Sequence, residues 1–362
     1  MNHSFDVEDL ILNYDPEAPA ERFVKGGLEA ALLARASRLP HPVSWPAGAR
    51  PAAQPLDPAP HENDDLTRFA GYDALVVTWT AAEAAALAAL FTPDHLPSAW
   101  YLYRHGVDAY IPLVTGPRAP FNDTKPDMAR YYHTLGLYFP CVIGNARVLL
   151  FKSGLHFAYD GPHTPLQRLV AELVQTIRPR LLITTGTGGG IGTQAKLGDV
   201  VIASKVKFDC TTQFKEAAFA KSEYSPSELP AGAIDAIAPD LTKVNAAYIQ
   251  GARPVPTIFT KPADALVTTD FFGFDDSTDH YRLQNLGRAC DMGDAMIGLT
   301  MKDFPLTRWY SVRNVSDPQI PNPDNDIEKA KREAGQIYTR YGPYTTAASV
   351  IATWAIITSA RA

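Results

Sequence analysis

The residues of this sequence that could do chemistry follow short apolar runs, which we expect to be β-strands. Glu83 comes after the run 74–78, and Asp317 follows the run 309–315. Carboxyl side chains such as these can donate or accept a proton in general acid–base catalysis. A doubly wound sheet gathers the carboxyl ends of its parallel strands in one crevice, so the pattern predicts one shared site. The other candidates that follow such runs are Ser153, Thr187 and Phe272.

Each carboxylate also has a structural explanation. Glu83 lies in the first turn of the alanine-rich segment 81–91, where a helix dipole favours an acid. Asp317 precedes Pro318, and an aspartate in that position is typical of a turn or a helix cap. Their shared location, rather than either residue alone, favours a functional site.

A glycine-rich stretch follows the apolar residues 181–183. We expect a strand over 181–185 and then a loop whose glycines allow positive φ angles or the close approach of a ligand. No Gly-Lys-Ser/Thr follows, and the spacing is not that of a dinucleotide fingerprint. A second strand, 198–204, comes next, so a phosphate site at a helix N-terminus is not supported.

The elements that must position these residues alternate between strands and helices. Thr80 is expected to cap the helix 81–91, and Pro179 to end the helix 164–177. This order predicts an α/β fold with parallel crossover connections. The remaining expected elements are strands at 147–152, 263–269 and 309–315 and helices at 277–286, 295–302 and from about 327 and 344.

The first 70 residues stand apart as an N-terminal extension. Residues 21–37 could form an amphipathic helix, and the prolines of 40–60 predict an extended connector without helix or sheet. The catalytic domain is expected at 71–362, with insertions near 92–145 and 207–262.

Composition excludes several classes of protein. Hydrophobic residues make up 46% and charged residues 20%, as in a soluble globular protein. The net charge of −6, without a basic block, argues against nucleic-acid binding. We expect no signal peptide and no membrane span, because the N-terminus is acidic and the apolar run 347–360 is short. Three scattered cysteines without metal or redox spacing predict a reducing, cytoplasmic location and neither metal nor cofactor.

Four motifs occur in a fixed order along the chain: Thr-Gly-Thr-Gly-Gly-Gly-Ile at 185–191, Leu-Gly-Asp-Val-Val at 197–201, Asp-Met-Gly-Asp-Ala at 291–295 and Val-Arg-Asn-Val-Ser-Asp at 312–317. Together they resemble the purine nucleoside phosphorylase / methylthioadenosine (S-adenosylhomocysteine) nucleosidase superfamily over about residues 72–360. The resemblance implies a three-layer α/β/α fold with a mixed, largely parallel central sheet. It also implies cleavage of the N-glycosidic bond of a small-molecule nucleoside or nucleotide, and a homo-oligomer.

The resemblance also implies residue roles. Asp317 matches the aspartate that protonates the purine at N7, and Phe272 the aromatic residue that packs on the base. Met292 matches the methionine beneath the ribose, while the glycine stretch would form the floor of a nucleoside pocket. The other expected substrate-binding residues are Thr187, Gly188, Gly189, Asp294, Arg313 and Ser316, of which Arg313 would support the site by pairing with a carboxylate.

Glu83 favours one branch of the family. It matches the glutamate that activates water in hydrolytic members, and the segment 78–83 lacks the glycine and arginine of a phosphate loop. A phosphate-dependent phosphorylase stays an alternative. So does a nucleoside-binding module with little turnover, because Gly293 stands where the family has a sugar-binding glutamate and the acid comes one residue later, at Asp294.

Overall fold

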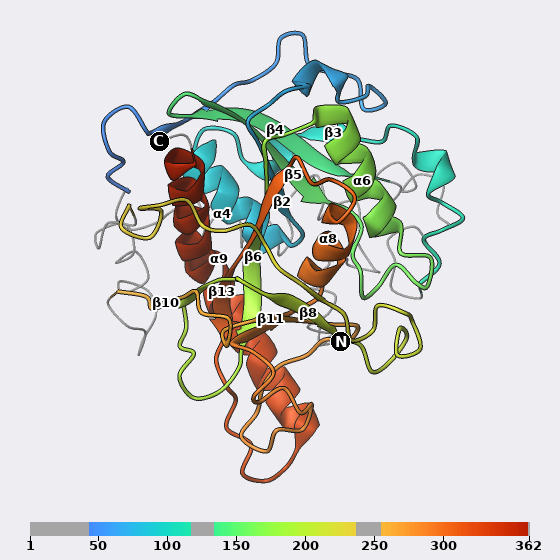
Figure 1. The fold of residues 1–362 in the computed structure, drawn as a ribbon, viewed down its shortest axis with the longest axis vertical. Coiled ribbons are helices and arrows are strands. Elements are labelled where there is room, and N and C mark those ends of the chain that lie inside the picture. The colour runs from blue at the N-terminus through green and yellow to red at the C-terminus, as the bar shows by residue number, and fades with distance from the viewer. Residues whose placement is uncertain (1–42, 117–133, 237–254, 361–362) are drawn as a thin grey trace, which may run out of the picture.

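A computed structural model describes residues 43–116, 134–236 and 255–360 of the chain. In these ranges one mixed sheet of 13 strands is covered by helices on both faces, which gives a three-layer α/β/α fold (Figure 1). The predicted α/β class is therefore confirmed.

The centre of the sheet consists of four parallel strands in the order β5 (Ala146–Ser153), β2 (Ala74–Thr78), β6 (Leu181–Gly190) and β13 (Arg308–Asp317). Every residue of β2 is buried, because helices cover both faces of the sheet and parallel strands lie on either side. This burial explains the continuous apolar run at 74–78.

The remaining strands extend this centre in both directions, and many of their pairings are antiparallel. On one side β4 pairs with β5, and on the other β12 pairs with the glycine end of β6. Their bounds are β1 Pro51–Ala53, β3 Tyr101–Tyr103, β4 Gly136–Ile143, β7 Val200–Ile202, β8 Val206–Asp209, β9 Glu223–Tyr224, β10 Ile258–Phe259, β11 Leu266–Thr269 and β12 Ala289–Asp291.

The predicted glycine loop is wrong, since β6 continues through it to Gly190. Its glycines pair with β13 and β12 as strand residues. A Cβ atom built on Gly186 would lie 2.2 Å from Glu83 Oε1, and one on Gly190 would lie 2.8 Å from Val315 Cγ1. The glycines therefore serve close packing inside a strand rather than a turn.

In the described ranges, helices cover both faces of the sheet (Figure 1). On one face α6 (Pro165–Ile177) packs with α8 (Asp294–Met301), and its buried residues recur at helical spacing. On the other face α4 (Ala81–Phe91) packs with α9 (Ile327–Ser359). Each helix pair encloses its own hydrophobic core against the sheet.

Two helix predictions are wrong. The chain from 327 to 359 forms one helix that runs through Gly342 and Pro343, where two helices were expected, from about 327 and 344. A proline inside a helix costs about 3 kcal/mol, and burial of the apolar run 347–357 offsets that cost. Residues 277–286 form turns instead of a helix, because Asp279, Arg282 and Asn285 adopt left-handed backbone angles.

The proline-rich segment is partly incorporated into the sheet, contrary to the expectation that proline prevents it. Strand β1 pairs antiparallel with β4, and Leu66 and Phe69, which follow it in the chain, are buried in the hydrophobic core that α6 and α8 form with the sheet. The expected helix at 21–37 lies outside the described residues, and the domain boundary at 70 stays a prediction. None of the helices in the described ranges, α9 included, has the length and apolarity needed to cross a bilayer.

Candidate active site

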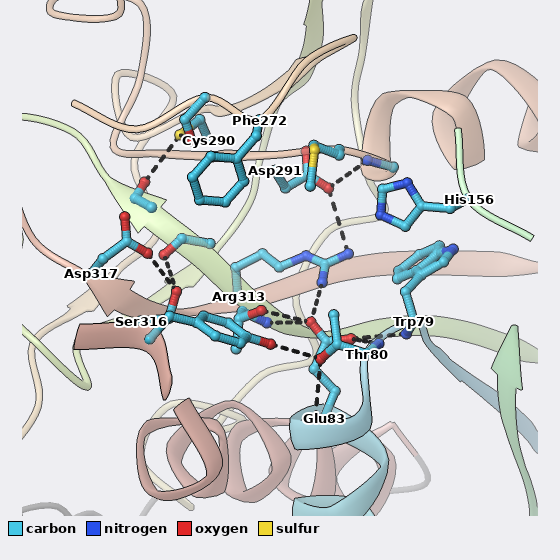
Figure 2. A pocket seen from close by; sticks show the side chains of 17 residues that line it. Trp79, Thr80, Glu83, His156, Phe272, Cys290, Asp291, Arg313, Ser316 and Asp317 are labelled. Carbon is cyan, nitrogen blue, oxygen red and sulfur yellow. Dashed lines mark hydrogen bonds and ion pairs between the residues drawn. The ribbon is translucent and has the colours of Figure 1, made fainter. Parts of the chain in front are cut away.

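A pocket lies where β2, β6 and β13 end, and it collects most of the predicted site residues (Figure 2). Nine of the ten line it, and Asp294 is the exception. Ser153 does not line it, since its hydroxyl bonds to the backbone of Leu155 and stabilises the turn after β5. The nine lining residues are Glu83, Thr187, Gly188, Gly189, Phe272, Met292, Arg313, Ser316 and Asp317.

The Glu83 carboxylate is buried and surrounded by donors. Oε2 accepts hydrogen bonds from Thr78 Oγ1 at 2.6 Å, from the Trp79 amide at 2.8 Å and from the Thr80 amide at 2.9 Å. Oε1 accepts from the Thr187 amide at 2.7 Å and hydroxyl at 2.9 Å, with Arg313 Nη1 at 3.4 Å. The Thr80 hydroxyl in turn accepts from the Glu83 amide, so the two residues form a capping box at the start of α4.

These donors decide the charge state of Glu83. Burial raises the pKa of this carboxyl, but the Arg313 guanidinium and the hydrogen bonds from Thr78, Thr187 and Thr80 outweigh it. The pKa of Glu83 is therefore lowered below its ordinary value, and the group is an anion at neutral pH.

Arg313, on β13, is the central cation of the pocket. Its Nε and Nη2 atoms donate to the two oxygens of Asp294 at 2.8 and 2.7 Å, a bidentate pair with both side chains buried. Nη2 also lies 3.5 Å from Asp291 Oδ2. The Asp294 carboxylate therefore binds the Arg313 guanidinium from outside the pocket. The predicted contact between Asp294 and the sugar stays a prediction.

Asp291 lines the pocket, and its carboxylate accepts hydrogen bonds from the backbone amides at the start of α8. Oδ2 accepts from the amides of Gly293 at 3.1 Å and Asp294 at 2.7 Å, and Oδ1 accepts from Thr268 Oγ1 at 2.6 Å. Burial, followed by repulsion from Asp294, raises the pKa of Asp291 to about 7.

Asp317 and Phe272 lie at the opposite end of the pocket from Trp79 and His156 (Figure 2). Asp317 Oδ1 accepts a hydrogen bond from Ser316 Oγ at 2.8 Å. Oδ2 faces the glycine strand, where a Cβ atom on Gly189 would come within 3.1 Å of it. Burial raises the pKa of Asp317 to about 6, against the opposing effect of the Ser316 hydrogen bond.

Several pocket residues had little or no signal in the sequence. Trp79 lines the pocket, and its ring lies 4.9 Å from the Arg313 guanidinium carbon. Tyr338 reaches the pocket from α9, where its hydroxyl donates to Thr80 Oγ1 at 2.9 Å. Its place at the pocket follows from the packing of α9 beside the start of α4, which no local pattern predicts. The other such lining residues are His156, Gly273 and Cys290, while Thr80 and Gly293, which the sequence had singled out for other reasons, line the pocket as well.

Metal binding finds no support in the described ranges, where no three His, Cys, Asp or Glu side chains gather as a metal site requires. The pocket offers instead a buried carboxyl with a raised pKa at one end and a neutralised cation among carboxylates at the other.

Comparisons with known proteins agree with this architecture. The sequence profile described as the phosphorylase superfamily matches residues 120–292. No curated protein matches the chain significantly. Among solved structures, a mutant of futalosine hydrolase from Helicobacter pylori strain 26695 has a TM-score of 0.50 at 10% identity, covering 79% of this chain and 99% of that one. The methylthioadenosine/S-adenosylhomocysteine nucleosidase from Neisseria meningitidis has a TM-score of 0.47 at 15% identity, covering 80% and 99%.

Because the sequence identity is only 10%, the similarity to futalosine hydrolase shows a shared fold and nothing further. The profile match covers two of the four sequence motifs completely and begins a third. The resemblance that these motifs predict is thereby confirmed, since residues 120–292, a little under half of the chain, match the phosphorylase superfamily.

Proposed function

We propose that the protein hydrolyses the N-glycosidic bond of a purine nucleoside and releases the free base. The observation that carries this proposal is Asp317, a buried carboxyl with a pKa raised to about 6 and an oxygen facing the glycine strand. A purine must not leave as an anion, so bond cleavage needs a carboxyl that still shares a proton near neutral pH.

The base would lie at the Asp317 end. Gly188 and Gly189 present backbone without side chains, and Phe272 supplies an aromatic ring on the lining of the same pocket. A flat heterocycle fits between such surfaces and places a ring nitrogen within reach of Asp317. Ser316 donates a hydrogen bond to the other oxygen of this carboxyl, Oδ1, so the proton for the base would be on Oδ2.

The sugar would lie at the other end, over Met292 and beside Glu83 and Arg313. Glycosidic cleavage passes through an oxocarbenium-like transition state, whose positive charge the carboxylates around Arg313 stabilise. Glu83 would orient the attacking water on the face opposite the base and accept its proton. Since its oxygens already accept from Thr187 and other donors, that water replaces one of these bonds.

The charges favour water over phosphate as the nucleophile. Arg313 is the one Lys or Arg side chain among the described lining residues, and it is paired with Glu83, Asp291 and Asp294. A phosphate dianion in this pocket would meet carboxylates without a free cationic partner. A phosphorylase would need a cation that these contacts do not leave available.

A second candidate is a nucleoside-binding protein with little turnover. The observation in its favour is the saturation of Glu83, which lowers the pKa of the carboxyl and makes it a weak base. Both candidate proteins would bind a nucleoside, and they differ in the rate at which the base is released.

Base release separates them. We would incubate the full chain with adenosine and inosine in phosphate-free buffer and measure free base by chromatography, for wild type and Asp317→Asn. The proposal expects release by the wild type and a loss of about 100- to 10,000-fold in the variant. Binding of nucleoside without release would favour the second candidate, and release only after phosphate is added would favour a phosphorylase.

Two expectations from the sequence also belong to this proposal. We expect a homo-oligomer, which sedimentation would test. We also expect a cytoplasmic protein, in which the buried Cys141, Cys210 and Cys290 stay reduced, as they are in the structure.

A further inference from the structure

Two buried polar atoms on residues that line the pocket have no hydrogen-bond partner in the described part of the chain. They are Trp79 Nε1 and His156 Nδ1, on residues that are 6% and 8% exposed. Both residues lie at the end of the pocket away from Asp317 (Figure 2). A buried polar atom without a partner costs free energy, and in native proteins such atoms normally bind water or a ligand. This end of the pocket therefore has a place for a small polar molecule.

Other contacts hold the two side chains in position. The Trp79 amide donates to Glu83 Oε2 at 2.8 Å, and the guanidinium carbon of Arg313 lies 4.9 Å from the centre of the indole ring. The His156 amide donates to Asp160 Oδ2 at 2.6 Å, which stabilises the turn after β5. Because these contacts use the backbone and the ring faces, the ring nitrogens are left for a bound molecule.

The two nitrogens require a neutral partner that both accepts and donates a hydrogen bond. The indole N–H of Trp79 can only donate. Burial lowers the pKa of His156 to about 3; the charge of Glu83 opposes this shift, and the charges of Arg313 and Lys152 add to it. The imidazole is therefore neutral at pH 7, and its Nδ1 accepts a hydrogen bond when the proton is on Nε2. A water molecule satisfies both nitrogens.

We propose that Trp79 Nε1 and His156 Nδ1 bind the water molecule that attacks the sugar. This inference rests on the proposed function and names two further residues of the same site. The water oxygen accepts a hydrogen bond from the indole N–H, while one O–H is donated to the imidazole and the other to Glu83. A single lone pair of the oxygen is then left to face the anomeric carbon, so the water is oriented for attack.

The saturation of Glu83 makes these contacts necessary. Its oxygens already accept from backbone amides and from the hydroxyls of Thr78 and Thr187. A water bound to Glu83 alone would have one weak contact and would be free to rotate. The indole and the imidazole supply a donor and an acceptor that no other described group occupies.

The reaction then balances without a further reactant. The glycosidic C–N bond breaks, and its electron pair leaves with the base, which takes the proton of Asp317. The water oxygen bonds to the anomeric carbon and becomes a strong acid, so even a weak base such as Glu83 accepts its proton. That proton passes to solvent, and Asp317 regains a proton from solvent.

Variants at both residues test the water site through base release. His156→Leu removes the imidazole, whereas His156→Asn keeps a hydrogen-bonding atom at the position of Nδ1. We expect kcat/KM on adenosine to fall about 100-fold in His156→Leu and less in His156→Asn. Trp79→Phe removes the N–H but keeps an aromatic ring, and it should lose about 10-fold.

The matched control is His95→Leu. It removes an imidazole that stacks on Phe139 and does not line the pocket, so the rate should stay that of the wild type. Equal rates in wild type and His156→Leu would overturn the inference while leaving the proposed function intact.

Methanol and 5′-deoxyadenosine identify the group that the two nitrogens bind. In buffer with added methanol, the ratio of methyl glycoside to free sugar should be higher in His156→Leu, because this variant no longer holds water in place. An unchanged ratio would mean a merely structural loss and would overturn the inference. The loss in His156→Leu should also be the same on adenosine and 5′-deoxyadenosine. A loss on adenosine alone would show that the nitrogens bind the 5′-hydroxyl of the sugar instead of water.

A crystal structure with bound nucleoside tests the water site without turnover. If the wild type releases no base, the proposed function fails, and this structure decides the water site separately. An ordered water that bonds to Trp79 Nε1 and His156 Nδ1 and faces the anomeric carbon supports the site. The absence of that water, or a nucleoside hydroxyl in its place, overturns it.

Discussion

Arg313 and Asp294 form a buried bidentate ion pair, with Nε to Oδ2 at 2.8 Å and Nη2 to Oδ1 at 2.7 Å. The pair joins β13 to the start of α8 and fixes the guanidinium that also contacts Glu83. Positions far apart in the sequence thus act as one electrostatic unit behind the pocket.

Removal of the cation should therefore destabilise the fold. Arg313→Met leaves Asp294 buried without a partner, and we expect a loss of about 3–5 kcal/mol in the free energy of unfolding, measured with urea. The exposed pair Arg168–Glu172 supplies the control, since Arg168→Met should cost about 1 kcal/mol or less. Similar losses in the two variants would contradict the structural role of Arg313.

The pH dependence of base release should report Asp317. Its pKa is raised to about 6, so the protonated form that the leaving base needs declines as the pH rises above 6. We expect log kcat/KM to fall with a slope of −1 above that pH in the wild type and to lose this limb in Asp317→Asn. A rate that rises through pH 6 to 8 would show that the ionised form is required.

Ionisation of the Asp317 carboxyl should lower the free energy of unfolding. A folded-state pKa above the unfolded value means that stability from this group is present at low pH and is lost as the pH rises through about 6. At pH 8 Asp317→Asn should therefore be more stable than the wild type, by about 2–3 kcal/mol at most. The side-chain amide oxygen of this variant can still accept from Ser316, so a less stable variant would argue against the raised pKa.

Two glycines of β6 should respond differently to an added methyl group. Gly186→Ala places Cβ 2.2 Å from Glu83 Oε1 and 2.6 Å from Arg313 Nη1, so we expect a loss of about 3 kcal/mol in unfolding free energy. Gly189→Ala comes within 3.1 Å of Asp317 Oδ2 and Cys290 Sγ, which narrows the base end. That variant should bind nucleoside more weakly while it unfolds nearly as the wild type does.

Glu83 should prove structural as well as catalytic. Glu83→Gln replaces one carboxylate oxygen by an NH2 group, which cannot accept a hydrogen bond. The donors on that side, at either Thr78 or Thr187, therefore lose their acceptor. We expect a loss of about 2–4 kcal/mol in unfolding free energy, besides slower base release. The control is Thr80→Ser, which keeps the capping hydroxyl and should change neither quantity by much; an unchanged stability in Glu83→Gln would contradict the observed hydrogen bonds.

The sequence predicts what depends on local pattern. A continuous apolar run identifies β2, and the spacing of Leu166 to Ile177 identifies α6, because burial imposes those patterns directly. The four motifs identify the family and most of the residues that line the pocket.

What the sequence does not predict depends on distant partners. The glycines of β6 look like a loop until β13 and Glu83 are packed against them. The bidentate pairing of Asp294 with Arg313 likewise joins residues of two elements, α8 and β13, and the local sequence around Asp294 does not predict it. Tyr338 lines the pocket because α9 packs beside the start of α4, where its hydroxyl reaches Thr80, and this tertiary contact has no local signal.

Hydrolysis is the central claim, and the sugar product tests it most directly. The full chain would be incubated with 2′-deoxyadenosine and adenosine in buffer containing inorganic phosphate, and the products followed by phosphorus and proton NMR. The charges around Arg313 predict free adenine and free sugar, at a rate that phosphate does not change. Formation of a sugar 1-phosphate would contradict the account.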